Sequence, residues 1–442
     1  MKKIFAKRAA AALLAGTLAL SVFTGCGDSK ETGGNTGSEL DPENPTKVTF
    51  YSYSLTYPSM KPGMEHLIQE FNDTVGKEKG VIVEGVPDAN MSKYKSDIQA
   101  GQQVDIVQHG WNSLDDSKEN MGIKAYEDVF PKDELEEHFS GMEQNAVKLG
   151  QIDGKTYGLA FTFSTPILYI NGTLFEQAGL DPNDPPKTWD EVLAAAKQIK
   201  EKTGKDGFGL SPQNGWVTEG VIFSNGGSML NSDRTKATFA SKEGVEAISK
   251  WKEFFTSGVA ALGTDSEVSQ AFMAGNVGMH IQSTSLLSGI LSSAEAGGWK
   301  VYGAAMPSFG EKTPAPVNSG SCLAVRPDSD LKAKAIWEFI KYVTGDEGYT
   351  IITSEIGYLP LRTYLADDEK YLKSFVDENP LVRVNIDQLK NVKPVTIWPA
   401  GTATECFTIF TDAITRSLTT DADVEKTLKE AQSQIDKILA QQ

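Results

Sequence analysis

The sequence predicts an α/β protein with two lobes, and three observations carry that prediction. The chain has 442 residues, more than a single hydrophobic core usually supports. Its first part alternates strand-like and helix-like segments, an order typical of parallel strands joined by right-handed crossovers. Residues 158–191 contain an apolar run typical of a strand that is buried on both faces. We therefore expect mostly parallel sheets flanked by helices.

The individual elements follow from residue periodicity. Strands are expected where β-rich residues alternate or run together, and helices where apolar residues recur three or four positions apart. The first part of the chain reads strand 47–54, helix 65–72, strand 80–86, helix 92–100 and strand 104–109. Helices are then expected at 190–203, 244–258, 267–275, 332–344 and 423–440, and strands at 207–211, 277–282, 300–305 and 321–325.

Residues 158–191 give the clearest local signals. They predict one strand over 161–171 and a short helix over 173–178. Gly179 stands where a helix C-cap belongs, and three prolines then forbid helix continuation. Thr188 with Glu191 three residues later predicts a capping box at the start of the next helix.

The N-terminus has the pattern of an export signal. Four basic residues precede an apolar segment, 9–22, that is too short to span a membrane. The segment ends at Gly25-Cys26, which resembles a bacterial lipobox, although Phe23 stands where that pattern prefers Leu. We expect a signal peptide over 1–25, lipidation at Cys26 and a disordered Gly- and Ser-rich tether over 26–45. Plain secretion with Cys26 incidental is the alternative.

Charge and cysteine content exclude several classes of function. Removing residues 1–25 removes four positive charges, so the formal net charge falls from −17 to −21. A domain this acidic is a poor partner for nucleic acid or for an anionic membrane surface. Cys322 and Cys406 have no paired spacing, which argues against a disulfide scaffold and a zinc site and predicts two buried, inert thiols.

Three segments resemble the extracellular solute-binding proteins of ABC importers, and most closely the sugar and glycerol-3-phosphate branch. The first is residues 158–191, with Thr-Pro, Leu-Tyr-Ile-Asn, Ala-Gly-Leu-x-Pro and Pro-x-Thr-Trp in that order; the others are FMAGNVGMHIQ (272–282) and GYLPLR (357–362). The resemblance implies a type II periplasmic-binding-protein-like fold with a hinge between its lobes. The expected lobes are 46–161 with 308–344 and 162–307 with 345–442, and the chain would cross between them near 161–165, 306–308 and 344–347.

No enzyme motif stands out in the sequence. The four histidines have no metal-ligand spacing, and no nucleophile elbow, phosphate loop or strand-adjacent dinucleotide fingerprint is present. We expect no metal, no cofactor and no catalysis. Two carboxylates converging from distant segments, as in a secreted glycosidase, remain the enzyme alternative.

Aromatic and small polar residues follow several predicted strands, a combination that suits a sugar with apolar faces and a hydroxyl rim. From position alone the candidates are Tyr53, Trp111, Asn112, Ser164, Thr165, Trp216, Ser283 and Gly320. The family resemblance adds Trp398, an aromatic plane in the loop where the glycerol-phosphate members place an Arg. The family resemblance implies ligand contacts at Tyr94, Ser164, Trp216, Ser283, Gly320 and Tyr358. Each tryptophan is about as well explained as a core residue, and Tyr53 is equally balanced between cleft and core.

Two departures from the glycerol-phosphate members favour a neutral sugar. Trp111 stands where those members place an acidic residue, and residues 397–401 lack the Arg that would hold a phosphate. We therefore expect a monomeric, lipid-anchored binding protein on the outer face of a bacterial membrane, which delivers a carbohydrate to permease subunits with a cytoplasmic ATPase. A glycerol 3-phosphate or phosphodiester ligand is the main alternative, and a surface adhesin or sensor partner with the same fold is a further one.

Overall fold

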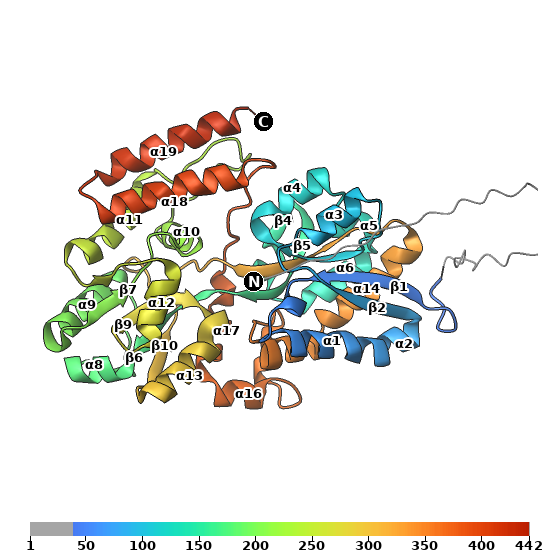
Figure 1. Ribbon diagram of the computed structural model, residues 1–442, viewed down its shortest axis with the longest axis horizontal. Helices are drawn as coiled ribbons and strands as arrows, with labels where there is room; N and C mark the ends of the chain where they lie inside the picture. The colour runs from blue at the N-terminus through green and yellow to red at the C-terminus, as the bar shows by residue number, and fades with distance from the viewer. Residues whose placement is uncertain (1–38, 442) are drawn as a thin grey trace, which may run out of the picture. The chain divides into compact units, whose positions relative to one another are not determined.

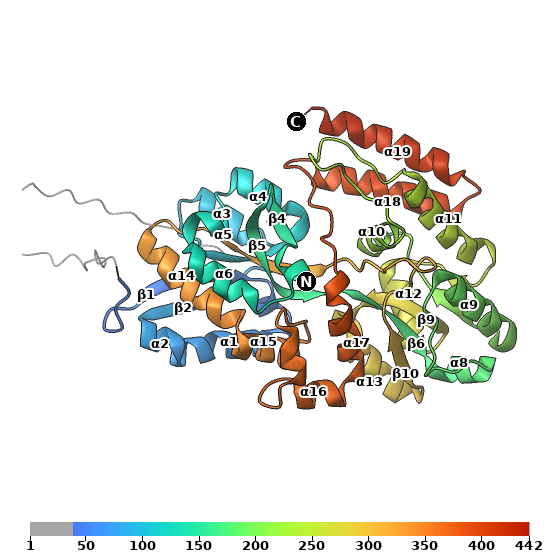
Figure 2. The same cartoon turned by 180° about the vertical axis from the view of Figure 1, so that it is seen from behind.

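Two mixed β-sheets, each surrounded by helices, organise the computed structural model (Figure 1). The structure describes residues 39–441. The predicted signal peptide, Cys26 and residues 26–38 of the predicted tether lie outside the described residues. Figures 1 and 2 show the two sheets at opposite ends of the described part of the chain, joined by strands that run between them.

The first sheet has the strand order β2-β1-β3-β11-β5-β4. Strands β1 and β2 are parallel, as are β1 and β3, whereas β11 runs antiparallel to both β3 and β5, and β4 runs antiparallel to β5. Its strands are β1 (Thr46–Ser52), β2 (Val81–Pro87), β3 (Ile106–Gly110), β4 (Gly150–Ile152), β5 (Lys155–Ser164) and β11 (Ser319–Val325).

The second sheet has the order β10-β6-β9-β7-β8. Strand β6 is antiparallel to both β10 and β9, and β7 is parallel to β9 and β8. Its strands are β6 (Pro166–Asn171), β7 (Asp206–Gly209), β8 (Ala260–Ala261), β9 (Val277–Ser283) and β10 (Val301–Ala304). The expectation of mostly parallel sheets is therefore wrong in detail. Strand β11 runs antiparallel to β3 in the first sheet, and β6 runs antiparallel to β9 in the second. A two-residue turn makes β4 and β5 antiparallel.

Helices bury each sheet in its own hydrophobic core. The first core takes side chains from α1 (Lys61–Asp73), α4 (Leu114–Asn120), α5 (Tyr126–Val129), α6 (Lys132–Ser140), α7 (Gln144–Val147), α14 (Asp330–Val343) and α15 (Asp346–Ile351), with α2 (Val75–Lys79) and α3 (Lys93–Gln99) nearby. The second takes them from α8 (Gly172–Ala178), α9 (Trp189–Thr203), α10 (Gly215–Ser224), α11 (Lys242–Thr256), α18 (Ala403–Thr419) and α19 (Val424–Leu439). Helices α12 (Asp265–Met273) and α13 (Leu287–Gly297) pack on the other face of the second sheet.

The predicted signals around the second lobe's first helices are confirmed. Gly179 ends α8 with φ +79°, the left-handed conformation that favours glycine. Thr188 accepts a hydrogen bond from the Glu191 backbone N–H, and the Glu191 carboxylate accepts from the Thr188 N–H, which completes the capping box. The predicted single strand over 161–171 is instead two strands, because the chain changes sheets at Thr165.

We call the part of the chain that packs in the first core lobe 1 and the part that packs in the second core lobe 2. The first crossing falls at Thr165, and the second runs from Met306, in the second core, to β11. The third expected crossing, near 344–347, is wrong, because Tyr349, Leu361 and residues as far as Ile397 pack in the first core. Helix α16 (Lys373–Glu378) and α17 (Pro380–Gln388) lead toward lobe 2, whose core starts again at Trp398.

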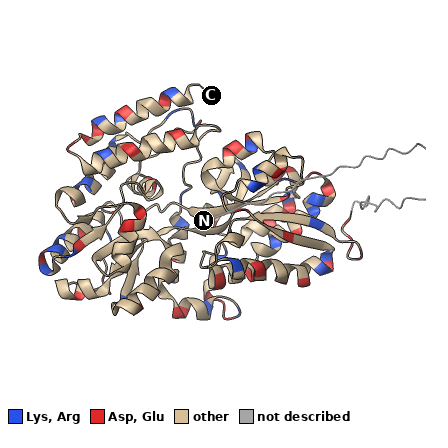
Figure 3. Cartoon of the chain, in the orientation of Figure 1, with Lys and Arg blue, Asp and Glu red and all other residues tan. Residues whose placement is uncertain are grey.

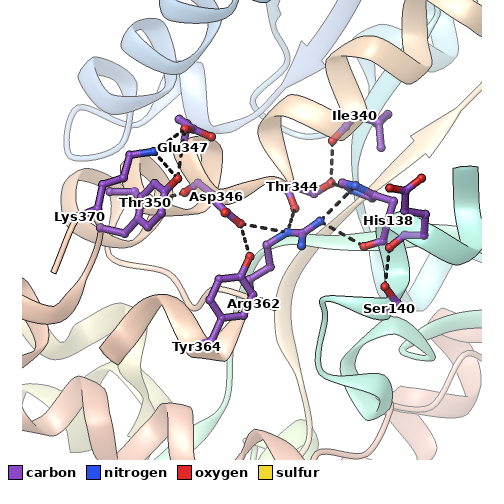
Figure 4. Close-up of polar contacts among 12 residues, drawn as sticks. His138, Ser140, Ile340, Thr344, Asp346, Glu347, Thr350, Arg362, Tyr364 and Lys370 are labelled. Carbon is purple, nitrogen blue, oxygen red and sulfur yellow. Dashed lines mark hydrogen bonds and ion pairs between the residues drawn. The ribbon is translucent and has the colours of Figure 1, made fainter. Parts of the chain in front are cut away.

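Arg362 shows why the chain stays with lobe 1 after α14. Its guanidinium donates to the backbone oxygens of Thr344 and His138 and to His138 Nδ1, at 3.0–3.2 Å (Figure 4). Since the Thr344 hydroxyl donates to Ile340, it accepts from His138 Nε2 at 2.8 Å, so this histidine is neutral with its proton on Nε2. The break at Gly345 is thus a turn between two lobe 1 helices, where the sequence suggested a linker.

The tether also ends earlier than expected. Leu40 packs against the first core, Glu39 pairs with Lys334 at 2.7 Å, and Gly80 lies directly against the Asp41 backbone. Residues 39–45 therefore belong to lobe 1. Within residues 39–441, none of the helices combines the length and the apolar character that crossing a bilayer requires.

Candidate functional site

A cavity of about 420 Å³ lies between the two lobes. Lobe 1 contributes the turn after β1 and the segment around Tyr358, lobe 2 contributes the end of β9 and α13, and α16 and α17 close one side. The lining residues are Ser59, Met60, Thr284, Ser285, Leu287, Ser288, Leu291, Ser292, Glu295, Thr353, Ser354, Glu355, Ile356, Gly357, Tyr358, Leu359, Phe375, Asn379 and Val382. Because both lobes line it, a molecule in this cavity would contact both.

The lining combines hydroxyls with apolar side chains and contains no Lys, Arg or His. The Thr353 hydroxyl is buried and has no hydrogen-bond partner, although it lines the cavity. A buried hydroxyl without a partner costs free energy, so a ligand atom that pairs with it would be favoured. Two carboxylates, Glu295 from lobe 2 and Glu355 from lobe 1, supply the charge of the lining.

A tyrosine pair joins this cavity to the end of the lobe 1 sheet. Tyr358 lines the cavity, and its pKa is raised above the usual value by burial and by the neighbouring Tyr53. Burial likewise raises the pKa of Tyr53, whose hydroxyl lies 3.4 Å from Thr162 Oγ1. Behind them the Gln108 amide donates to Thr162, at 2.7 Å, and to Ser321. Both phenols are therefore neutral hydrogen-bonding groups.

A second series of hydrogen-bonded polar side chains connects the two lobes at Thr165, the first crossing. Ser164 and Ser283 share a hydrogen bond of 2.7 Å between their hydroxyls, and Ser283 in turn contacts Ser285 at the cavity wall. The series of hydrogen bonds continues from Ser283 through Gln282 to Asp265. Asp265 also accepts from Asn214, which caps α10. Trp216, in the first turn of that helix, is half-buried and packs against both cores.

Thr165 is a crossing residue with no exposed surface. Gln388 of α17 donates to its hydroxyl at 2.9 Å and to the Pro166 oxygen at 2.7 Å, and accepts from the Met306 N–H at 3.2 Å. Asn385 accepts from the Thr165 hydroxyl and donates to Thr284 at the cavity wall. These bonds tie the first and second crossings to one helix. The crossing strands β6 and β11 contain no charged residue (Figure 3).

The structure does not gather all the predicted residues around this cavity. Tyr358 lines it, and Ser283, Ser164 and Tyr53 stand behind its wall. Tyr94 is fully buried in lobe 1, with its hydroxyl 3.0 Å from both His109 Nε2 and Ser117 Oγ. Asn112 is exposed. Their ligand roles stay predictions.

Trp111 and Trp398 are buried in different cores, Trp111 in the first and Trp398 in the second. Neither indole N–H has a hydrogen-bond partner. The core interpretation that the sequence left open thus accounts for their packing, and their ligand roles stay predictions.

Gly320 is required by the fold of lobe 1. Its φ is +82°, at an irregularity in the pairing of β11 with β5, and a Cβ there would stand 2.2 Å from the Thr162 oxygen. The expected contact of its N–H with a ligand stays a prediction.

Sequence reasoning missed most of the cavity lining. Phe375, Thr353 and the α13 side chains lie in segments without a motif, and only the tertiary fold brings them together. The run of small polar residues Ser283–Ser285 was a sequence signal that pointed to the lining residues Thr284 and Ser285. Among residues 39–441, no three His, Cys, Asp or Glu side chains gather closely enough to hold a metal ion. Cys322 and Cys406 are both buried and unpaired, as predicted.

Two mixed α/β lobes joined by crossing strands, with a cavity lined from both sides, define the class of two-lobed binding proteins of the type II periplasmic fold. The family model for bacterial extracellular solute-binding proteins matches residues 66–381. The chain belongs to that family.

Individual relatives agree with this assignment. A protein of Brucella abortus (strain 2308) that is named as a binding protein is 29% identical over 297 residues, covering 65% of this chain and 69% of its own length. The sn-glycerol-3-phosphate-binding periplasmic protein UgpB of Escherichia coli (strain K12) is 27% identical over 248 residues, 53% of this chain and 55% of that protein.

Two solved structures share the fold. The cyclic alpha-maltosyl-1,6-maltose binding protein of Arthrobacter globiformis superposes with a TM-score of 0.78 at 23% identity, over 90% of this chain and all of that one. UgpB of Mycobacterium tuberculosis in complex with glycerophosphocholine has a TM-score of 0.74 at 21% identity, over 90% and 99%. At these identities the likeness shows the fold alone.

Proposed function

We propose that this chain captures a neutral carbohydrate, a mono- or oligosaccharide, between its lobes and delivers it to the permease of an ABC importer. The observation that carries the proposal is the cavity lining: hydroxyls and one amide come from both lobes, and no cationic side chain is among them. A neutral polyol needs this kind of paired donor and acceptor.

The apolar part of the lining suits the faces of a sugar ring. Leu287 and Leu291 come from α13, and the half-buried Phe375 comes from α16. A pyranose presents C–H groups on its faces and hydroxyls around its rim, so one wall can pack while Thr353 and Tyr358 form hydrogen bonds. The neutral hydroxyl of Tyr358 can both donate and accept.

A phosphodiester is the competing ligand, since relatives are named for sn-glycerol 3-phosphate and one fold neighbour holds glycerophosphocholine. Phosphate recognition uses Arg or Lys, which form charge-assisted hydrogen bonds. This cavity instead presents Glu295 and Glu355. Two carboxylates would repel a phosphate, so the lining favours the neutral sugar.

Transport rather than catalysis is the proposed role. A ligand held by both lobes binds one lobe arrangement better than another, and so shifts the hinge equilibrium toward the form that docks on a permease. We further propose that Cys26 carries the lipid that holds the protein, as a monomer, on the outer face of the bacterial membrane. Mass spectrometry of the protein from membranes tests the lipid, because a free Cys26 thiol would contradict it.

Titration calorimetry tests the ligand class. The panel contains D-glucose, maltose, maltotriose and maltotetraose beside D-tagatose, glycerol 3-phosphate and glycerophosphocholine. We expect binding of at least one neutral sugar and none of the two phosphates. Binding of a phosphate with no response to any neutral sugar would reverse the choice of ligand.

Variants then test the cavity. Thr353→Val keeps the shape of the side chain but removes the unpaired hydroxyl, and we expect it to weaken the bound sugar about tenfold. Thr419→Val, at an exposed position on α18, is the matched control and should leave affinity unchanged. Equal affinity in wild type and Thr353→Val would show that the sugar binds elsewhere.

A further inference from the structure

A closed ring of four alternating charges joins the two lobes away from the cavity. Asp115 of α4 contacts Arg234 at 3.1 Å and Lys118 at 3.5 Å, while Asp153 contacts Arg234 at 3.7 Å and Lys118 at 3.6 Å. Asp115, Lys118 and Asp153 belong to lobe 1, whereas Arg234 lies in a turn between Leu230 and Ala237 of the second core. The bonds to Arg234 therefore cross from one lobe to the other.

Asp115 is the centre of this ring. It is 4% exposed, and its Oδ2 accepts from the Arg234 guanidinium and from the Ala400 N–H, both at 3.1 Å. Ala400 follows Trp398, where the chain has re-entered lobe 2. A carboxylate this buried depends on its partners, because losing one leaves a charge away from water. One lobe 1 carboxylate thus holds two separate segments of lobe 2.

The backbone is strained at two members of the ring. Among residues 39–441, three non-glycine residues have positive φ: Met91, Asp153 at +53° and Arg234 at +55°. Such conformations cost free energy in L-residues and persist where surrounding contacts enforce them. For Arg234 the enforcing contact is Asn231, whose side chain accepts from the N–H groups of Thr235 and Lys236. These bonds to Asn231 hold the turn from which Arg234 reaches Asp115.

We propose that Asp115 and Arg234 form an interlobe latch that stabilises the lobe arrangement described here against other hinge positions. A ligand that binds a different arrangement must break the latch, so the latch lowers that ligand's affinity by the same factor that it favours the present arrangement. This consequence for affinity rests on the proposed function, whereas the effect on the lobes needs no ligand. The two can therefore fail separately.

Distance measurement between the lobes tests the latch without ligand. Spin labels are placed on Lys132→Cys of α6 and Lys242→Cys of α11, whose side chains are 88% and 81% exposed, in a Cys26→Ser background. The test variants are Asp115→Asn and Arg234→Asn, and asparagine tolerates positive φ at position 234. The control, Asp206→Asn, breaks a 2.8 Å ion pair with Lys200 inside lobe 2.

We expect each test variant to change the ratio of interlobe distance populations at least about tenfold, and the control to match wild type. The effect of the double variant Asp115→Asn with Arg234→Asn should be smaller than the sum of the two single effects, since each single variant already removes the ion pair between these two residues. Distributions that superimpose on wild type, or independent effects that add, would overturn the proposal. Hydrogen exchange in Arg234→Asn gives a label-free readout: the Ala400 amide should exchange at least about tenfold faster, and an unchanged rate also counts against the latch.

Discussion

Glu219→Gln probes a buried carboxyl beside Ile397 and Trp398, where the chain passes from the first core to the second. Glu219 lies on α10 with no exposed surface, and its Oε2 accepts from the Thr396 N–H and hydroxyl, both at 2.8 Å. Its Oε1 has no partner. Burial raises the pKa from 4.5 to about 7, and the two bonds from Thr396 offset only part of that rise. The glutamine keeps the acceptor for Thr396 and removes the titration.

The sign of the pH effect follows from the raised pKa. Below pH 4.5 the carboxyl is protonated in the folded and unfolded chain alike, so it adds no pH dependence. Between pH 4.5 and about 7 the unfolded chain releases the proton while the folded chain keeps it, and the free energy of unfolding falls as pH rises. At about 1.4 kcal/mol per pH unit, the loss reaches about 3 kcal/mol above pH 7.

Urea unfolding of both proteins from pH 4.5 to 8.5, at constant ionic strength, measures this loss. The free energy of unfolding of Glu219→Gln minus that of wild type should rise by about 3 kcal/mol across the series, because all other titrations cancel. The unpaired amide of the glutamine shifts the whole curve by a constant. Glu176→Gln, at an exposed position on α8, is the control substitution. A flat difference for Glu219→Gln itself would show that burial does not raise the pKa of Glu219.

Three further predictions follow from single contacts. Gly320→Ala should lower the free energy of unfolding by about 1–3 kcal/mol because of its positive φ and the nearby Thr162 oxygen, and an unchanged urea midpoint would contradict this. Burial, Arg362 and Lys341 lower the pKa of His138 to about 3, so the unfolded chain takes up this proton first as the pH falls below 6.5. The free energy of unfolding should therefore fall by about 3 kcal/mol by pH 4.5. His138→Gln should remove this loss from the acid side of the pH profile measured by urea unfolding. Gln388→Ala should destabilise the fold by about 2 kcal/mol and broaden the interlobe distance distribution, since three hydrogen bonds at two crossings are lost; a distribution as narrow as wild type would argue against its role at the hinge.

Local signals in the sequence predicted the elements well. The capping box at Thr188, the glycine cap at Gly179 and the alternating strands depend on residues within a few positions of one another, so the chain reveals them directly. Whether neighbouring strands run parallel or antiparallel was harder to predict, because β5 and β11 pair across more than 150 residues. The third crossing was misplaced for a similar reason: Gly345 looks like a linker until Arg362 is seen bonded to His138 and Thr344.

The residues of the candidate site also fall into two groups: those that the sequence could reveal and those that it could not. Tyr358 and Ser283 could be found because Tyr358 lies in, and Ser283 directly follows, a segment that resembles the solute-binding proteins; both lie at or behind the cavity wall. Thr353 and Phe375 could not, since nothing in their neighbourhood distinguishes a wall residue from a core residue. The hydroxyl of Tyr94 contacts His109 and Ser117 inside lobe 1, and its ligand role stays a prediction.

Periodicity, helix caps and short motifs were enough to predict the α/β class, the position of most helices and strands, and the family. Only the folded chain shows which side chains face the cavity, how the strands pair and where Arg234 meets Asp115. These features depend on contacts between segments that are distant in the sequence. The free energy of each contact is set by the burial of its groups and by the hydrogen-bond and packing partners that the folded chain places beside them.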